Sequence, residues 1–251
     1  MEEIKLNSNE RLDDLQLGGL KIIQKVGGYG FTSDSVLLAN FVKAKKSDVC
    51  VEIGAGCGII SILVNYKQKP AKIFAYELQK SQCELFSRNV QICNMCDSIE
   101  IINDKVQNYK KYTKEGSADI VFSNPPYFKY DEKVCGAISE KVLSRFDKEL
   151  PLKDLFLSVS KMLKFGGKFY FIYDSDRLDD CILTMKNYNL IPKQIYFIHP
   201  NQTKNSTTFL CLATLGGKQS LKIMPPIFTN DFDGNYIETL QKLFNTENKN
   251  N

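Results

Sequence analysis

The sequence predicts an α/β fold with a mostly parallel sheet. Short apolar runs typical of buried strands alternate with longer amphipathic stretches typical of helices over residues 48–189. A glycine-rich loop separates the first of these strands from its helix. The last two apolar runs, residues 193–200 and 207–215, have no helix between them, which favours an antiparallel hairpin at one edge of the sheet.

The first 47 residues differ from the rest. Residues 14–30 contain two apolar runs and several glycines, a pattern that predicts two short strands. Residues 33–44 then predict a short amphipathic helix, with Ser33 as its N-cap and Asp34 in its first turn. We expect residues 1–47 to form an extension that packs on the core.

The core is expected to comprise residues 48–244, followed by a polar, disordered tail of residues 245–251. Its strands are short apolar runs bounded by polar residues, as in a parallel sheet covered on both faces. Seven strands are expected, at residues 48–53, 71–77, 98–103, 118–123, 166–174, 193–200 and 207–215. Helices are expected at residues 59–67, 81–94, 152–163 and 177–189.

Composition excludes several classes of protein. Of the 251 residues, 43% are hydrophobic and 25% charged, which is ordinary globular usage and excludes a mainly disordered or coiled-coil chain. No apolar run is long enough to span a membrane, and the polar N-terminus resembles no secretion signal, so we expect a cytoplasmic protein. The net charge of +4 permits a nucleic-acid partner without requiring one. Cys93 and Cys96 form one C-x-x-C pair without a second, so we expect no metal site.

The glycine-rich loop carries the first functional signal. Gly54, Gly56 and Gly58 allow a tight turn and a close approach of the backbone to a ligand, at the positive end of the following helix. Glu77 ends the second core strand, where its carboxylate could accept hydrogen bonds from both hydroxyls of an adenosine ribose. Asp104, after the third strand, could reach an adenine edge. Three glycines alone could form only a turn, but all three features lie at the carboxyl ends of strands, where such sheets bind ligands.

This order of features resembles the Rossmann-like class I methyltransferases that depend on S-adenosylmethionine, over about residues 48–215. The resemblance implies S-adenosylmethionine as the cofactor. It also implies a mostly parallel seven-stranded sheet with an antiparallel edge hairpin. It also places the acid that precedes the loop near the methionine portion, and the start of the first helix over the cofactor. The residues assigned to the cofactor are Ser33, Asp34, Glu52, Gly54, Ala55, Gly56, Gly58, Glu77, Leu78 and Asp104.

A second signal follows the fourth strand, where Asn124, Pro125, Pro126 and Tyr127 form an Asn-Pro-Pro-Tyr tetrad. Two prolines fix φ and stiffen the loop, which can then aim the Asn124 side-chain oxygen and the Pro125 carbonyl at one planar NH₂ group. Accepting both N–H bonds favours a pyramidal nitrogen whose lone pair can attack a methyl group. Tyr127 offers a ring for stacking on a base. The alternative is an ordinary Asn-Pro turn that closes a strand.

The tetrad resembles that of the amino-methyltransferases that act on adenine N6, cytosine N4 or glutamine amide nitrogen. DNA adenine methyltransferases usually carry a large target-recognition region, for which too few residues follow Tyr127. Release-factor glutamine methyltransferases carry a helical domain before the glycine loop, whereas residues 14–30 predict strands. The glutamine enzyme remains the enzymatic alternative, and an RNA-binding assembly factor with a degenerate cofactor pocket remains the non-enzymatic one.

Several stretches across the chain resemble a narrower family, the bacterial tRNA(Val) adenine-N6 methyltransferases, which modify the adenosine on the 3′ side of the anticodon. Among them are FTSDSVLLANF, VEIGAGCGIISIL, NPPYFK and RLDD. The resemblance implies the anticodon stem-loop of a tRNA as partner, adenine 37 as target, and a monomeric enzyme. The chain departs from the family at Phe146, where a histidine is usual, and at Ile237, where a threonine is usual.

Contacts to RNA are expected around the mouth of the site. An anticodon-loop base is already partly unstacked, so presenting it costs less than extruding one from a duplex. Lysines that follow the first helix could bind phosphates there, and they are Lys43, Lys45 and Lys46. The residues after the tetrad that we assign to the substrate are Phe128, Lys129, Tyr130 and Arg145, with Lys133 and Lys141 nearby.

Overall fold

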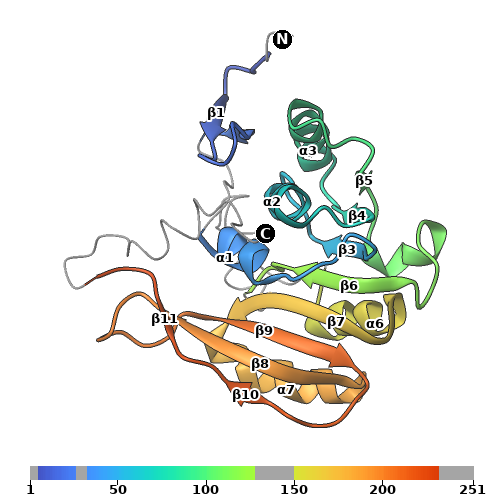
Figure 1. Cartoon of the computed structure of the whole chain (residues 1–251), viewed down its shortest axis with the longest axis vertical. Helices are drawn as coiled ribbons and strands as arrows, with labels where there is room; N and C mark the ends of the chain where they lie inside the picture. Colours follow the sequence, from blue (N-terminus) through green and yellow to red (C-terminus); the bar gives the residue numbers. More distant parts are fainter. Residues whose placement is uncertain (1–4, 27–32, 128–149, 232–251) are drawn as a thin grey trace, which may run out of the picture.

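A nine-stranded sheet forms the centre of the computed structural model, which describes residues 5–26, 33–127 and 150–231 (Figure 1). Its strands lie in the order β10-β8-β9-β7-β6-β3-β4-β5, and β11 also pairs with β8. The core strands are β3 (Val49–Ile53), β4 (Lys72–Tyr76), β5 (Ile99–Ile102), β6 (Ala118–Ser123), β7 (Leu163–Asp174), β8 (Leu190–His199) and β9 (Thr208–Leu215). The edge strands are β10 (Lys222–Ile223) and β11 (Ile227–Phe228).

The predicted fold class is confirmed. Strands β5, β4, β3, β6 and β7 are parallel, and β9 is inserted antiparallel between β7 and β8. The number of strands was underestimated, because β10 and β11 add to the edge that the β8–β9 pair was expected to form. Each has only two residues, since Pro225 and Pro226, which cannot donate to a ladder, lie between them.

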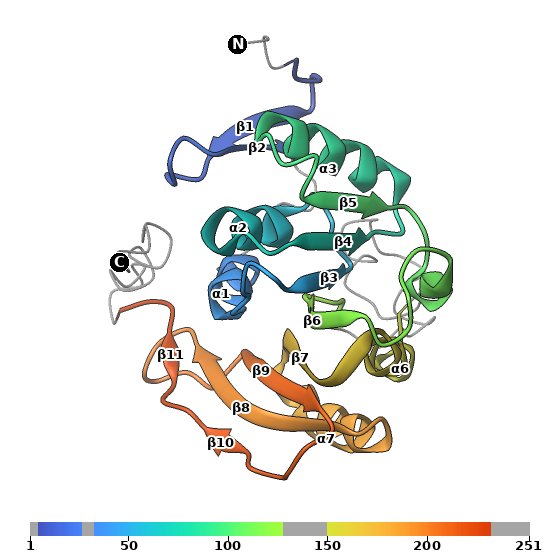
Figure 2. The same ribbon diagram turned by 45° about the vertical axis from the view of Figure 1, so that its right-hand side comes forward.

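Helices cover both faces of the sheet (Figure 2). On one face lie α1 (Ser33–Phe41), α2 (Ile59–Gln68) and α3 (Lys80–Ile92), which share one hydrophobic core with the sheet. A second core packs the other face under α6 (Leu152–Met162), α7 (Leu178–Asn187) and the 3₁₀ helix η1 (Val106–Lys111). A 3₁₀ turn, η2 (Ser175–Arg177), leads from β7 into α7. Within the described residues, no helix is long and apolar enough to cross a membrane.

Helix α1 is not amphipathic, in contrast to our prediction. The five consecutive residues from Ser35 to Ala39 are all buried. The helix packs against both α2 and β7, and the Phe41 ring makes edge-to-face contacts with Tyr170 and Tyr196, at centroid distances of 5.3 and 5.4 Å. Because neighbours surround the helix, it has no face left for solvent. The helix also begins at Ser33 itself, one residue earlier than an N-cap at that position would place it.

The N-terminal hairpin consists of the antiparallel strands β1 (Glu10–Asp14) and β2 (Lys21–Lys25), which form a separate sheet beside α3 (Figure 2). Two strands were predicted within residues 14–30, and the first of them lies earlier than predicted, since β1 ends at Asp14. The turn of the hairpin contains Gly18, whose φ of +52° is left-handed. A Cβ at Gly18 would lie 2.0 Å from the Tyr66 hydroxyl, so the turn sits directly on α2. Ile22 and Ile23 are buried in the same core as α2 and α3. The hairpin therefore packs against α2 and α3.

Candidate active site

The residues singled out in the sequence gather at the carboxyl edge of the sheet. Strands β3 and β6 are parallel neighbours, with Ile53 in register with Ser123. The Ser123 hydroxyl donates to the Ile53 carbonyl oxygen at 2.8 Å. The glycine loop after β3 and the tetrad after β6 therefore leave the sheet side by side.

The loop itself has left-handed backbone at Gly54, Gly56 and Gly58, with φ of +74°, +55° and +88°. A Cβ at Gly58 would lie 1.9 Å from the Phe86 ring of α3, so this glycine is required by packing as well as by conformation. A Cβ at Gly54 or Gly56 would meet no atom of the described residues within 4 Å. Open space therefore lies over the first part of the loop, where a ligand could approach the backbone.

Glu77 lies against this loop. Its Oε2 accepts a hydrogen bond from the Gly56 N–H at 2.8 Å, and its Oε1 accepts one from the Gln79 N–H at 2.7 Å. The side chain is buried, and burial raises the pKa of the carboxyl, although these backbone hydrogen bonds lower it in part. The Asn103 amide holds the backbone here by donating to the carbonyl oxygens of Glu77 and Leu78, both at 3.0 Å. Each carboxylate oxygen keeps a lone pair for a further donor.

Glu52 is completely buried at the foot of the loop. Its Oε2 accepts hydrogen bonds from the Ser61 N–H, at 3.1 Å, and from the Ser61 hydroxyl. Among the described residues, no group donates to its Oε1. Burial raises the pKa of Glu52 to about 8, against the lowering effect of Ser61. The carboxyl group therefore joins β3 to the first turn of α2 and keeps one buried oxygen without a protein partner.

The Asp104 carboxylate is occupied by hydrogen bonds from residues that follow it in sequence. The Asn108 amide, the Tyr112 hydroxyl and the Lys111 ammonium group donate to it, at 2.7, 3.0 and 3.2 Å. The hydrogen bond from Asn108 is the main reason why the pKa of Asp104 is lowered, and the Lys105 N–H adds another. Asp104 thus anchors η1, and its reach to an adenine stays a prediction.

The tetrad is held by side chains that are distant in sequence. Pro125 is buried, while Asn124 and Tyr127 are half-buried. The Asn124 amide nitrogen donates to the Ser35 hydroxyl of α1 at 3.1 Å. With the amide nitrogen directed at Ser35, the oxygen Oδ1 is the atom that remains for other donors.

The Tyr127 hydroxyl lies between two acceptors, 2.5 Å from Asn124 Oδ1 and 3.2 Å from Asp34 Oδ2. One hydroxyl proton can serve only one of them at a time. Burial raises the pKa of the Asp34 carboxyl, and the hydrogen bond from Tyr127 opposes this rise. Asp34 therefore lies against the tetrad, and Ser33 is the half-buried first residue of the same helix.

Arg177 holds the far end of the tetrad. Its guanidinium donates to the Tyr127 carbonyl oxygen at 3.0 Å and to the Tyr173 hydroxyl at 2.8 Å. It forms an ion pair with Asp180 at 3.4 Å and is only 14% exposed. The rings of Tyr127 and Tyr173 meet edge to face, 5.5 Å apart. The carbonyl that follows the two prolines is thereby fixed by a charged donor.

Three residues of this arrangement were missed in the sequence, namely Ser35, Tyr173 and Arg177. Ser35 follows the two residues assigned to the cofactor but carried no signal of its own. Arg177 had a usable signal, because it follows the strand next to β6 in the sheet and the carboxyl ends of parallel neighbours meet at one edge.

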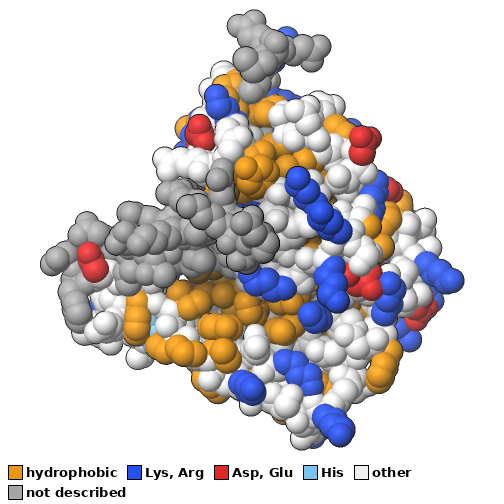
Figure 3. Space-filling model, viewed as in Figure 1, with side chains coloured by type: hydrophobic (Ala, Val, Ile, Leu, Met, Phe, Trp, Pro, Cys, Tyr) orange, Lys and Arg blue, Asp and Glu red, His pale blue; other side chains and the backbone are white. Residues whose placement is uncertain are grey.

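The lysines after α1 do not surround the site, in contrast to our expectation. Helix α1 starts beside Tyr127 and ends near the amino end of β3, where the Lys45 N–H donates to Asp48 Oδ2. Lys43, Lys45 and Lys46 therefore lie at the opposite edge of the sheet. Lys and Arg side chains on the face shown in Figure 3 are dispersed over it. The other expected substrate contacts, Phe128, Lys129, Tyr130, Lys133, Lys141 and Arg145, lie outside the described residues.

Metal chemistry has no candidate centre in the described part of the chain, since no three His, Cys, Asp or Glu residues come together there. Cys93 is half-buried and donates through Sγ to the Lys21 carbonyl oxygen at 3.4 Å, while Cys96 is exposed. The arrangement offers instead a glycine loop with a carboxylate beside it, and an oriented amide oxygen on the next strand.

Comparison with known proteins agrees with this arrangement. The family model described as "Methyltransferase small domain" matches residues 30–174. A curated relative from Dyadobacter fermentans is 26% identical over 144 residues, and the match covers 57% of this chain and 58% of the relative. One from Bacteroides thetaiotaomicron is 26% identical over 171 residues, 68% of each protein. Both are named tRNA1(Val) (adenine(37)-N6)-methyltransferase.

Solved structures share the fold. A predicted O-methyltransferase from Agrobacterium tumefaciens superposes with a TM-score of 0.68 at 18% identity, covering 84% of this chain and 95% of that one. The geranyl diphosphate C-methyltransferase of Streptomyces coelicolor, solved with S-adenosyl-L-homocysteine, has a TM-score of 0.55 at 14% identity, covering 71% of this chain and 80% of that one.

Proposed function

Because the chain belongs to the methyltransferase small domain family, we propose that it transfers a methyl group from S-adenosylmethionine to the N6 amine of an adenine in tRNA. The family match confirms the methyltransferase expected from the sequence and agrees with S-adenosylmethionine as its cofactor. The proposed target is position 37 in the anticodon loop of a tRNA(Val), the position in the names of the curated relatives.

The glycine loop and its neighbours suit this cofactor. The open space over Gly54 and Gly56 can admit a ligand to the backbone, and Ala55 lies between them. We assign the ribose hydroxyls to the Glu77 carboxylate, whose Oε2 already contacts the loop at the Gly56 N–H. Leu78 is 41% exposed beside it and is assigned to the adenine face, with Asp104 at the adenine edge. The bound cofactor would supply an electrophilic methyl group on a sulfonium.

Glu52 and Asp34 complete the proposed cofactor site. Glu52 Oε1 is a buried oxygen at the foot of the loop for which the described chain supplies no donor, which supports its assignment to the methionine side. Ser33 and Asp34 are assigned to the rim over the cofactor. The contact between Asp34 and Tyr127 links that rim to the tetrad.

The orientation of the Asn124 amide is the observation on which the proposed reaction depends. Ser35 takes the amide nitrogen as its donor, so Oδ1 can accept a proton of the target amine with the lone pair that Tyr127 leaves free. The Pro125 carbonyl, made rigid by Pro126, is assigned as the second acceptor. With both of its N–H bonds accepted, the amine can turn its lone pair toward the methyl group. Tyr127 is assigned to the face of the base.

Recognition of tRNA is proposed to involve the segment after the tetrad, with Phe128, Lys129, Tyr130 and Arg145 as contacts. Phe146 replaces the histidine usual in the similar family, so the loop contacts to the target are expected to differ from those of the relatives. We expect a monomer that acts in the cytoplasm on the anticodon stem-loop.

The proposal is tested by transfer of a labelled methyl group from S-adenosylmethionine to purified tRNA, with a release factor as the competing acceptor. We expect label in tRNA only, and N6-methyladenosine after nuclease digestion and mass spectrometry. Label in the release factor alone would support glutamine methylation instead. Retention of RNA on a filter with label in neither acceptor would support the non-enzymatic alternative.

A further inference from the structure

We infer that Asn89 is a positioning residue for the cofactor loop, and that the N-terminal hairpin holds its side chain in place. The inference rests on the proposed cofactor site, and extends it to the hairpin in residues 5–26. It assigns this extension a function in cofactor affinity.

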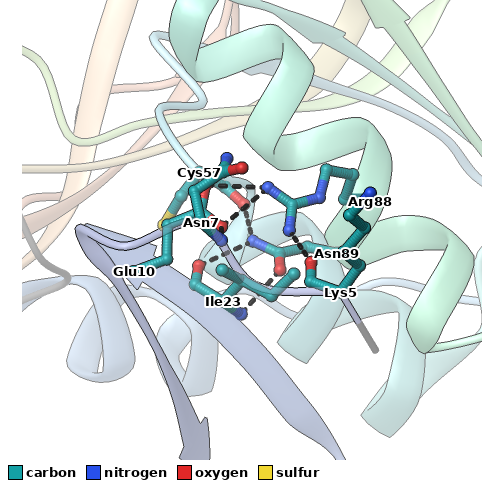
Figure 4. A network of polar contacts seen from close by, with 7 residues as sticks. All are labelled: Lys5, Asn7, Glu10, Ile23, Cys57, Arg88 and Asn89. Carbon is teal, nitrogen blue, oxygen red and sulfur yellow. Dashed lines mark hydrogen bonds and ion pairs between the residues drawn. The ribbon is translucent and has the colours of Figure 1, made fainter. Parts of the chain in front are cut away.

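Asn89 lies on α3 with 0% of its surface exposed and contacts both the hairpin and the glycine loop (Figure 4). Its Oδ1 accepts the Ile23 N–H at 2.7 Å, and its Nδ2 donates to the Ile23 carbonyl oxygen at 3.2 Å. The same Nδ2 donates its second hydrogen to the Cys57 carbonyl oxygen at 3.0 Å. Both amide hydrogens of Asn89 are therefore used. One of them forms a hydrogen bond with the peptide between Cys57 and Gly58.

The hairpin contacts Asn89 through the backbone of Ile23 in β2. Ile23 is in register with Leu12 of β1, but its backbone N–H and carbonyl both meet Asn89. Asn89 thus pairs with β2 much as a residue of a third strand would. A two-stranded hairpin is marginal by itself, so this pairing both stabilises the hairpin and fixes the rotamer of Asn89.

A second contact of α3 secures the other strand. The Arg88 guanidinium NH1 group contacts both carboxylate oxygens of Glu10, at 2.7 and 2.9 Å, and NH2 donates to the Lys5 carbonyl oxygen (Figure 4). This ion pair lowers the pKa of Glu10 to about 2. Adjacent residues of one helix thus hold β1 and β2, but only Asn89 also contacts the glycine loop.

The glycine loop has little freedom on this side. Phe86, one turn before Asn89, lies where a Cβ of Gly58 would be, so α3 packs directly on the loop. Without Asn89, the Cys57 carbonyl oxygen would lose the donor that α3 gives it, a cost large enough to change the loop conformation. The peptide between Cys57 and Gly58 is continuous with the neighbouring peptides at Gly56 and Gly58, which we propose face the cofactor. A shift of the loop would therefore lower cofactor affinity.

The test is calorimetric titration of Asn89→Ala with S-adenosylmethionine. We expect the Kd to rise about tenfold while kcat at saturating cofactor stays within twofold. Val90→Ala is the matched control, because this neighbour is buried in the same core and its truncation weakens the packing of α3 without removing any hydrogen bond of Asn89. Its Kd should stay within twofold. An unchanged Kd in Asn89→Ala, or an equal rise in Val90→Ala, would overturn the inference.

Hydrogen exchange of the unaltered protein gives a second test, which decides the matter if Asn89→Ala does not fold. Coupling is reciprocal, so saturating cofactor should slow local exchange of the hairpin amides at residues 20–25 about tenfold. Amides of the β8–β9 pair, at the far end of the sheet, should not change. If the hairpin amides exchange equally fast with and without cofactor, the inference is wrong. If the unaltered protein binds no S-adenosylmethionine at all, the proposed function fails instead.

Discussion

The glycine loop and the tetrad lie side by side but are held in different ways. The loop is held mainly through its backbone: Tyr76 O accepts the N–H groups of both Gly54 and Ala55, and Glu77 and Asn89 contact the peptides that follow. The tetrad is held at its side chains and at its last carbonyl, by Ser35 and Asp34 from α1 and by a guanidinium from η2.

The difference separates two tasks. Except for the hairpin, the supports of the glycine loop come from the β3–α3 stretch. The tetrad is supported by residues that are distant in sequence. Ser35 is 89 positions before Asn124, Asp34 is 93 positions before Tyr127, and Arg177 is 50 positions after Tyr127. The tetrad thus depends on contacts from distant parts of the fold. If the proposed roles are correct, variants of the tetrad should lower the rate, whereas variants of the loop should lower cofactor affinity.

The largest effect is expected for Asn124→Ala. The variant loses a preorganised acceptor of the target amine, so kcat should fall on the order of 10²–10³-fold. Cofactor Kd should stay within about threefold, because the glycine loop keeps its own contacts. Single-turnover methyl transfer and calorimetry measure the two quantities.

Ser35→Ala is the companion variant, since it keeps the amide but removes the contact that orients it. Its kcat should fall less than that of Asn124→Ala. A Kd that rises as much as kcat falls in either variant would remove the distinction between the two regions.

Glu77→Ala should have the complementary effect. One charged hydrogen bond contributes about 1.5–3 kcal/mol, so cofactor Kd should rise on the order of 10–100-fold. The rate at saturating cofactor should change little. Calorimetric titration checks this, with Glu84→Ala, on the same side of the sheet in α3, as the control. Unchanged affinity would refute the ribose assignment.

An intermediate effect on the rate is expected for Arg177→Ala. Without the guanidinium, the Tyr127 carbonyl loses its charged donor, and kcat should fall about tenfold. Added guanidinium ion should restore part of the rate by occupying the vacated position. A rate that guanidinium does not restore, accompanied by a lower melting temperature, would mean that Arg177 only supports the fold.

The smallest effect is a pH-dependent gain in stability from Glu52→Gln. Burial raises the pKa of Glu52 from 4.5 to about 8, so the folded state holds this proton more tightly than the unfolded chain. The contribution of this proton to folding stability is therefore fully present below about pH 4.5 and is lost as pH rises toward about 8. The glutamine variant avoids this loss and should exceed the wild type in Tm at about pH 8, with no gain near pH 4. A gain that does not vary with pH would contradict the assigned pKa shift.

The sequence predicted those parts of the molecule that depend on local pattern. All seven core strands and their order along the chain follow from apolar runs. The glycine loop could be recognised because Gly54, Gly56 and Gly58 need left-handed backbone at that place. Strands β10 and β11 were not predicted, because a strand of two residues is too short to show a periodic pattern.

Long-range contacts could not be predicted. Helix α1 has apolar residues at the positions of an amphipathic helix, but the polar residue Ser35 is buried as well. Lys43, Lys45 and Lys46 were expected at the site, since the sequence does not show that α1 runs away from it. The site residues assigned from sequence keep their proposed roles until the variants above are measured.

The place of β9 has a consequence for biosynthesis. This strand is the last of the seven core strands to leave the ribosome, yet it lies between β7 and β8 and is hydrogen-bonded to both. Until it emerges, the earlier strand β8 has no neighbour within the core, and its apolar face stays open to other chains. A chain that ends before residue 208 would thus leave one edge of β7 and both edges of β8 unpaired, the kind of surface that chaperones protect.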